Sequence, residues 1–323
     1  MDLMLNEEQE QIVTAVANWL QSELPVARLR HLEEPDAQST WAELGQGGWL
    51  AIGLQESYGG AGLGLADEAL VYREFGRHLL PPCTLGTTLA ARVAARAGDT
   101  VLTQILLSGN ARVALALRGW LYDSVAATHV LTWNEGQARV LQAVNLPRHA
   151  SIDPAVSLVE FSDADLNALP ELARAEAGRI ELECQVLCAA MLTGIAEAVR
   201  DLSVTYVCER QQFGQPIGAF QAVKHPCADM AVTAEASLAQ TKVAALHLDN
   251  GSPDARFHVL AAQIVAYSGA LRSARRAIQV HGGMGITAEC LVHFYLKRTH
   301  LLGQIAGNLP MLQDSLLHEV APA

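Results

Sequence analysis

Charged and aromatic residues are both scarce in this sequence. Asp, Glu, Lys and Arg make up 17% of the 323 residues and Phe, Trp and Tyr only 5%, whereas hydrophobic residues make up 50%. So little charge excludes the low-hydrophobicity, high-charge composition of disordered chains. The length is sufficient for two or three packed units with substantial cores.

Basic residues are the minority among the charged ones. The 22 Lys and Arg stand against 34 Asp and Glu, which gives a formal net charge of −12. Because an acidic surface repels a phosphate backbone, we expect no nucleic acid as a partner. A local basic patch for a phosphorylated cofactor is compatible with this balance.

Several signals of location and redox chemistry are missing. No two of the six cysteines form a C-x-x-C pair, no run of 18 or more residues is apolar, and residues 1–23 contain no basic segment followed by an apolar one. We therefore expect no secretory leader, no membrane span and a cytoplasmic location. Cys184 and Cys188 lie one helical turn apart in an apolar pattern, which favours buried thiols over a metal or redox site.

The first 110 residues carry the period of amphipathic helices. Ile12, Val16 and Leu20 recur on one face after a helix start at Asn6. Further helices are expected near residues 41–50, 66–80 and 85–107, with a glycine-rich loop at 57–62.

Residues 111–176 have the pattern of a small β unit. Apolar runs at 113–117, 130–133, 140–144 and 156–161 predict strands, and Asn134-Glu135-Gly136 predicts a hairpin turn between the second and the third.

The chain is helical again from residue 177 to the end. Three long patterns cover residues 181–209, 219–248 and 253–280, and each predicts a helix of ~40–45 Å at 1.5 Å per residue. Their apolar faces require cover from each other and from another chain. The sequence thus predicts a mainly α protein with an N-terminal helical domain (1–110), a small β domain (111–176) and a C-terminal bundle of long helices (177–323).

Two stretches of the bundle combine glycines with anion-binding side chains. One runs from Glu209 to Gln221 and the other from Gln279 to Gly285. Adjacent glycines let a backbone approach a bulky anion, and the fork of Arg210 suits a pyrophosphate. Spacing alone favours the alternative that Gly214 and Gly282 end helices and that Arg210 binds the last carbonyls of its helix.

The sequence resembles the acyl-CoA dehydrogenases in several separate elements that occur in the same order. They are Gly45-x-x-Gly48-Trp49, the run from Glu56 to Gly64, Arg210-x-x-Phe213-Gly214, the run from Phe220 to His225 with Ala228-Asp229-Met230, and Gln279-x-His281-Gly282-Gly283-x-Gly285. The resemblance covers most of the chain. It implies the family's fold and its FAD-dependent oxidation of the Cα–Cβ bond of an acyl-CoA thioester.

The resemblance also implies a cofactor site shared between two chains. In this family FAD lies at a dimer interface, so one chain contacts the ADP part of an FAD whose flavin sits in the neighbouring subunit. We call the residues that match these contacts the ADP clamp; they are Arg210, Phe213, Gln221, Gln279, Val280 and Gly283.

The family's catalytic base has no counterpart in the sequence. A base must be an ionisable group within hydrogen-bond reach of the α-proton, and the position of the usual glutamate is Ala306. The position used by other members is Cys184, followed by Gln185 where an arginine is common. Glu183 is the fallback base; it lies ~100° round the helix from Cys184, so we expect it to point elsewhere, as a solvated or helix-N-terminal charge.

The family's flavin-embracing segments are also missing, because the chain passes from Leu117-Arg118-Gly119 directly to Trp120. Trp120 and Trp133 are candidates for a partial substitute, although a tryptophan in a small β unit usually belongs to the core. For His225 and His281, a place near the cofactor and a role in packing both stay open, and no spacing supports a metal site.

A chain that keeps the ADP clamp but lacks the base and the flavin-embracing segments resembles the non-catalytic chain of heteromeric acyl-CoA dehydrogenases. The resemblance implies an α2β2 heterotetramer with a catalytic subunit, a bulky acyl-CoA substrate such as a steroid side-chain thioester from lipid degradation, and electron-transfer flavoprotein or a similar acceptor. The alternatives are a self-sufficient homomer that uses Glu183, a flavin-dependent oxygenation that needs no such base, and a purely structural subunit.

Overall fold

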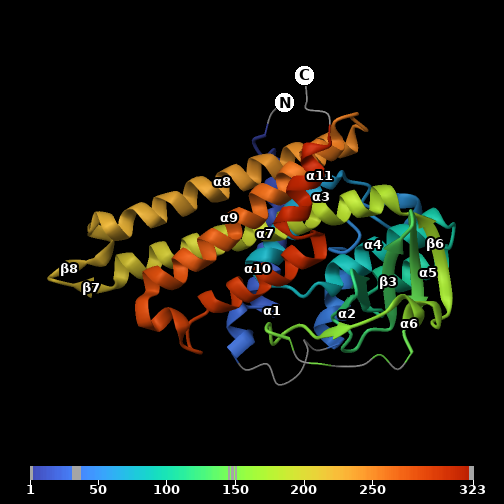
Figure 1. The fold of residues 1–323 in the computed structure, drawn as a ribbon, viewed down its shortest axis with the longest axis horizontal. Coiled ribbons are helices and arrows are strands. Elements are labelled where there is room, and N and C mark those ends of the chain that lie inside the picture. Colours follow the sequence, from blue (N-terminus) through green and yellow to red (C-terminus); the bar gives the residue numbers. More distant parts are fainter. Residues whose placement is uncertain (1–2, 31–37, 145, 147–148, 150, 320–323) are drawn as a thin grey trace. The chain divides into compact units, whose positions relative to one another are not determined.

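The computed structural model describes residues 3–30, 38–144, 146, 149 and 151–319 (Figure 1). They form two compact units, which we call the helical unit (residues 3–30, 69–79 and 185–319) and the sheet unit (residues 38–68 and 80–184). The predicted class, mainly α with a small β part, is confirmed. The finer division into three domains at residues 110 and 176 stays a prediction.

The helical unit begins with α1 (Glu7–Glu23), which starts at the expected residue. Asn6 accepts a hydrogen bond from the backbone N–H of Gln9 (2.8 Å), and the Gln9 side chain accepts one from the N–H of Asn6 (3.2 Å). This capping box satisfies two donors that the helix leaves unpaired. The short helix η1 (Val26–Arg30) and most of α3 (Leu65–Arg77) belong to the same unit.

Three long helices carry most of the helical unit. They are α7 (Ala177–Glu209), α8 (Gln221–Asp249) and α9 (Ala255–His281), followed by α10 (Val292–Ala306) and α11 (Leu309–Leu317). Helix α9 packs against α8, α10 and α11 (Figure 1). Among the described helices, α7 alone is long and apolar enough to cross a membrane, and 94% of its apolar window is buried, as in a core helix.

Two glycines let α3 and α7 pack backbone against backbone. A Cβ on Gly194 would lie 1.9 Å from the carbonyl oxygen of Arg73, and one on Gly76 would lie 2.0 Å from that of Met191. No side chain fits at either position, so the close packing of these two helices depends on both glycines.

The sheet unit contains a six-stranded sheet. Its strands are β1 (Val113–Leu117), β2 (Trp120–Tyr122), β3 (His129–Asn134), β4 (Gln137–Gln142), β5 (Leu158–Glu160) and β6 (Glu171–Glu176). The order is β5-β2-β1-β3-β4-β6; β1 runs parallel to β3, and every other neighbouring pair is antiparallel. The predicted hairpin is confirmed, with Glu135 and Gly136 at φ 46° and 77° in its two-residue turn.

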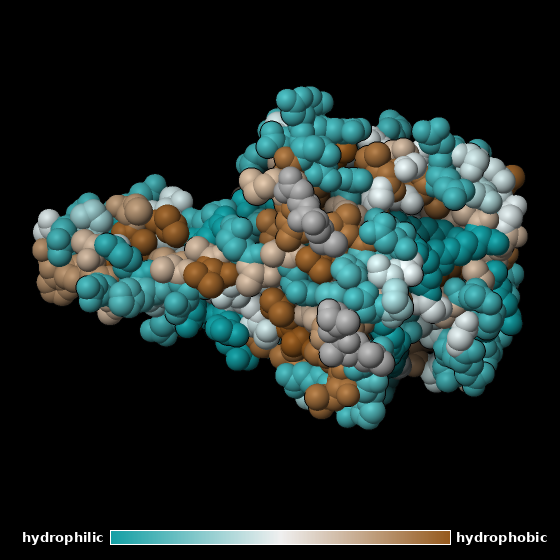
Figure 2. Space-filling model, turned by 90° about the horizontal axis from the view of Figure 1, so that it is seen from above, coloured by the Kyte–Doolittle hydropathy of each residue, from teal (hydrophilic) through white to brown (hydrophobic). Residues whose placement is uncertain are grey.

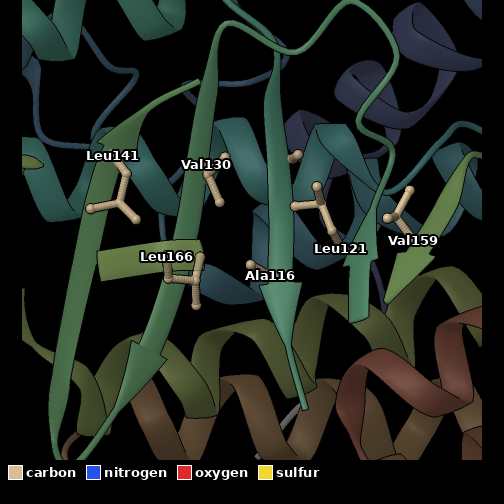
Figure 3. Close-up of a cluster of buried hydrophobic side chains, with 7 residues drawn as sticks. Ala116, Leu121, Val130, Leu141, Val159 and Leu166 are labelled. Atoms are coloured by element: carbon tan, nitrogen blue, oxygen red, sulfur yellow. The ribbon is translucent and has the colours of Figure 1, made fainter. Parts of the chain in front are cut away.

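Both faces of this sheet are covered, which explains why all five residues of β1 are buried. On one face lies α4 (Cys83–Arg96), so close that a Cβ on Gly86 would be 2.3 Å from the carbonyl oxygen of Val113. Figure 3 shows the cluster that includes Leu166 of α6 (Asp163–Asn167). Its buried members are Ala114, Ala116, Leu121, Val130, Leu141, Val159 and Leu166.

The remaining helices of the sheet unit are α2 (Gln38–Gln46), η2 (Glu56–Tyr58) and α5 (Thr100–Leu107). Trp41 of α2 donates a hydrogen bond from its indole nitrogen to the carbonyl of Ala111 (2.7 Å). Thr88 of α4 donates one to the carbonyl of Leu50 (3.0 Å). These bonds fix the connections that precede η2 and β1.

Candidate functional site

The first half of the ADP clamp lies in the connection between α7 and α8. The backbone N–H of Arg210 bonds to Tyr206 (2.9 Å), and its carbonyl accepts from the N–H of Ile217 (2.8 Å). Between these bonds a small hairpin forms from β7 (Gln211–Gln212) and β8 (Gln215–Pro216). Phe213, at φ 51° in its turn, is 91% exposed.

The second half lies where α9 ends. Gln279 and Val280 occupy the last turn of α9, and Gly283 lies in the following short helix η4 (Gly282–Ile286). The rings of Tyr206 and His281 stack with their centroids 4.4 Å apart, which joins the ends of α7 and α9. Both halves therefore lie at the same end of the three long helices (Figure 1).

The ADP clamp fits an external anionic cofactor. Among the described residues, the side chains of Arg210, Gln221 and Gln279 are exposed and make no hydrogen bond or ion pair within the chain. Gly283 has no positive φ, and a Cβ there would meet nothing within 4 Å, so the chain's own packing gives no reason for a glycine. A bulky group that approaches this backbone from outside the chain would require a glycine here.

The structure also decides between the two interpretations of the neighbouring glycines. Gly282 ends α9 at φ 61° and donates its N–H to the carbonyl of Gln279, as a helix-ending glycine does. For Gly214 the helix-ending interpretation was wrong, because this residue occupies the β7–β8 turn at φ 79°.

Neither of the two positions that the resemblance assigns to the family's base carries a carboxyl group. Ala306 is the last residue of α10 and is 2% exposed. Cys184 is 1% exposed on α7, and like Cys188 it is a buried free thiol, as predicted. A buried methyl group at position 306 cannot accept a proton.

Glu183 lies in the sheet unit, where three arginines surround its carboxylate. Its oxygens are 3.0 Å from Arg92 Nη1, 3.1 Å from Arg96 Nη2 and 2.8 Å from Arg179 Nε. The side chain is only 5% exposed, so the expectation of a solvated charge was wrong. Arg92 also pairs with the fully buried Glu68, one of whose oxygens, Oε1, has no partner in the described part of the chain.

This surrounding makes Glu183 a poor base. Burial alone would raise the pKa of Glu183, but the positive charges of Arg92, Arg96 and Arg179 outweigh it and hold that pKa below its usual range. At the neighbouring Glu68, burial prevails and raises the pKa. A carboxylate with a lowered pKa gives up its ion pairs when it takes a proton, which opposes proton abstraction.

Glu183 nevertheless faces a cavity. The cavity has a volume of about 410 Å³ and lies entirely within the sheet unit. It is lined by Gly53, Leu54, Gln55, Tyr58, Arg92, Ala95, Arg96, Arg179 and Glu183. Cys184, the family's alternative base position, is not among these residues.

The resemblance places the family's flavin-binding segments between β1 and β2, where this chain has only a tight turn. Leu117 pairs with Trp120 across the β1–β2 hairpin, and Arg118 and Gly119 fill the turn at φ 52° and 79°. Trp120 is 42% exposed, so a place in the core was the wrong expectation for it. Both Trp120 and Trp133 line a cavity of about 260 Å³, together with Ala116, Leu117, Arg118, Gly119, Thr132, Asn134, Phe161, Asp163 and Leu166.

The two histidines of the matching motifs have different surroundings. His281 is 8% exposed, and its Nδ1 lies 2.7 Å from the carbonyl oxygen of Ala277. Together with the stacked Tyr206, this bond gives His281 a role in packing at the end of α9. His225 is exposed near the start of α8.

Two family models match the chain. The N-terminal domain of acyl-CoA dehydrogenases matches residues 6–112, and the C-terminal domain matches residues 183–316. The relative acyl-CoA dehydrogenase IpdE2 of Mycobacterium tuberculosis is 34% identical over 307 residues, which cover 93% of each chain. This chain belongs to the acyl-CoA dehydrogenase family. A further relative, FadE34 of the same organism, is 30% identical over 81% of this chain and 39% of its own length.

Several solved structures share the fold of this chain. A variant of the Tcur3481-Tcur3483 steroid ACAD has a TM-score of 0.82 at 24% identity over 96% of both chains. The ChsE4-ChsE5 complex from Mycobacterium tuberculosis has a TM-score of 0.81 at 21% identity over 100% of both chains. An FAD complex of PigA has a TM-score of 0.83 at 18% identity over 98% of both chains. FAD is the cofactor that the family and its FAD complexes support.

Sequence analysis missed the arginines around Glu183. Arg92 and Arg96 lie one helical turn apart on α4, and this spacing is a signal for a shared face. Arg96 and Glu183 are 87 positions apart in the chain, however, so nothing local pairs them.

Proposed function

We propose that this chain is the non-catalytic subunit of an FAD-dependent acyl-CoA dehydrogenase, which desaturates the Cα–Cβ bond of an acyl-CoA thioester. The observation that carries the proposal is Ala306: the position of the family's base is a buried methyl group in this chain. A catalytic partner subunit supplies the base. This chain contributes the ADP clamp to the FAD that the partner holds.

The exposed groups of the ADP clamp support a site completed by a second chain. Arg210 carries a charge suited to phosphate, and Gln221 and Gln279 offer amide groups, yet all three side chains are exposed. When bound, FAD supplies the acceptor for the hydride that leaves the β-carbon. The residues of this chain hold the ADP part and leave proton abstraction to the partner.

Exposed hydrophobic side chains in the same unit support an interface. Phe213, Val232 and Ile286 are 91%, 71% and 77% exposed. Figure 2 shows hydrophobic surface among hydrophilic surface at its left end, where Figure 1 places the β7–β8 hairpin. Apolar residues exposed beside a cofactor site fit a protein partner that covers them.

The similar proteins suggest the substrate and the assembly. One structural neighbour is a steroid ACAD and another is the ChsE4-ChsE5 complex. We infer an α2β2 heterotetramer that acts on a bulky acyl-CoA, such as a steroid side-chain thioester. Electron-transfer flavoprotein or a similar protein accepts the electrons, and the location is cytoplasmic.

Substitution of the clamp arginine tests the proposal. In the complex with the co-expressed partner, Arg210→Ala is expected to weaken FAD binding about 10- to 100-fold, because it removes a charge-assisted hydrogen bond worth ~1.5–3 kcal/mol. Fluorescence titration of the deflavinated complex with FAD measures this. Arg272→Ala, at an exposed arginine of α9, is the matched control and should bind FAD like the wild type.

Two results would contradict the proposal. FAD affinity that survives Arg210→Ala would leave this chain a purely structural subunit. An isolated chain that binds FAD and reduces it with an acyl-CoA would be a self-sufficient enzyme.

A further inference from the structure

Two histidines and an aspartate meet at the turn between α8 and α9. His247 lies in the last turn of α8, Asp254 directly precedes α9, and His258 follows one helical turn later. Their side chains are 20%, 25% and 16% exposed. The three residues are therefore half-buried and accessible from solvent.

The backbone of the turn fixes these three positions. The N–H of Ser252 donates to the carbonyl of His247 (3.0 Å), and the N–H of His258 donates to that of Asp254 (3.2 Å). Gly251 reverses the chain at φ 62°, a conformation that a glycine adopts without strain. Because the backbone already holds these three side chains close together, little conformational entropy would be lost if they bound a common ligand.

The potential ligand atoms are close to the spacing that a tetrahedral ion requires. His247 Nδ1 lies 2.8 Å from Asp254 Oδ1, and His258 Nε2 lies 3.5 Å from Asp254 Oδ2. One ligand atom from each residue lies within 4.8 Å of the other two. Ligands ~2.0–2.1 Å from a zinc ion at tetrahedral angles are ~3.4 Å apart, so side-chain adjustments of about an ångström assemble the site.

The ring nitrogens of His258 make no short hydrogen bond within the described part of the chain. Its Nδ1 is buried and has no hydrogen-bond partner among the described residues, and its contact with Asp254 is long. The rings of His247 and His258 lie 4.0 Å apart between centroids, so one nitrogen of each can reach the same ion. Because the contact with Asp254 is longer than an ordinary hydrogen bond, Nε2 of His258 can bind a metal ion without losing a strong partner.

We propose that His247, Asp254 and His258 bind one Zn²⁺ ion through two imidazole nitrogens and one carboxylate oxygen, with water in the fourth position. Nitrogen ligands favour zinc over Mg²⁺ and Ca²⁺, which take oxygen ligands. The ion joins the end of α8 to the start of α9 and so stabilises their hairpin. The site is independent of the proposed function, because Gln221 of the ADP clamp lies about 39 Å away along α8 at 1.5 Å per residue.

Zinc titration of the purified, metal-free complex tests the proposal. The affinity tag is removed, because a polyhistidine tag binds zinc itself, and bound metal is stripped with a chelator. Isothermal titration calorimetry is expected to show one Zn²⁺ site that Asp254→Asn and His258→Gln each weaken at least about 10-fold. His318→Gln, at an exposed histidine of α11's C-terminal end, is the matched control and should leave the affinity unchanged.

Two further measurements separate this site from others. Cys208 is an exposed thiol, so Cys208→Ser should keep the zinc site, and Co²⁺ in place of zinc should show no sulfur-to-metal charge-transfer band. Zinc should raise the unfolding temperature of the wild type but not of the His247→Gln/His258→Gln double variant. Zinc affinity that survives in the double variant, or no site in the wild type, would overturn the proposal and leave a hydrogen-bonded cluster.

Discussion

Glu183 is held by Arg92, Arg96 and Arg179 in the interior of the sheet unit, and its role follows from those contacts. Replacement by glutamine would leave the guanidinium groups without their shared counter-charge. We expect Glu183→Gln to lower the free energy of unfolding by about 3 kcal/mol, because breaking a buried ion pair strands its partners. Urea denaturation measures this loss, with Glu209→Gln, at the exposed end of the same helix, as control.

The pH dependence of that loss has a defined sign. The pKa of Glu183 is lowered in the folded state, so its contribution to stability is complete above its ordinary value of 4.5 and is lost as the pH falls through the lower folded value. The stability difference between wild type and Glu183→Gln should shrink below about pH 4.5. Glu68, whose pKa is raised by burial, acts in the opposite direction but is present in both proteins.

The same variant distinguishes a structural carboxylate from a base. We expect the folded Glu183→Gln complex to oxidise its acyl-CoA at close to the wild-type rate. Unchanged stability together with abolished turnover would instead make Glu183 the base of a self-sufficient enzyme.

At the scale of elements, the close packing of α3 and α7 rests on glycines. A methyl group on Gly194 would meet the backbone of Arg73 at 1.9 Å, whereas one on Gly178 of the same helix would meet nothing within 4 Å. Gly194→Ala should therefore destabilise the chain by about 3 kcal/mol. Gly178→Ala should stabilise it by up to about 1 kcal/mol, because alanine favours helix. Equal unfolding midpoints for these two variants would contradict the prediction, because they would show that α3 and α7 can move apart without loss of stability.

The long elements were predictable because their signals repeat over many residues. The expected helices 181–209, 219–248 and 253–280 correspond to α7, α8 and α9 with ends shifted by at most four residues. Strands β2 and β6 were missed: β2 has three residues, and β6 reads Glu-Leu-Ala-Arg-Ala-Glu, which favours helix in isolation. Pairing with β4 forms β6, a tertiary effect that local pattern does not contain.

The candidate site was predictable only in part, for a similar reason. The residues of the ADP clamp lie in contiguous motifs, and the structure places both motifs at one end of the bundle. Arg179 lies one helical turn before Glu183 on α7, whereas Arg92 and Arg96 come from α4, far away in the sequence, so only the fold brings these two to Glu183. The cluster of His247, Asp254 and His258 is local, but a spacing of seven and four residues across a turn is a weak signal by itself.

At the scale of the whole molecule, the proposed role rests on the exposed side chains of the ADP clamp and on the buried alanine at the proposed position of the family's base. Arg210 and Gln279 are exposed, Phe213 projects into solvent, and Ala306 is buried. A single explanation accounts for these features: one FAD is shared between this chain and a catalytic partner. The complex then holds fewer flavins than chains.

Flavin content per chain tests this claim most directly. Absorbance of the released flavin, divided by the protein concentration, is measured for the chain alone and for the chain co-expressed with an acyl-CoA dehydrogenase partner. The account predicts no flavin in the isolated chain and about one FAD per two chains in the complex. An isolated chain that carries one FAD and is bleached by an acyl-CoA would contradict it.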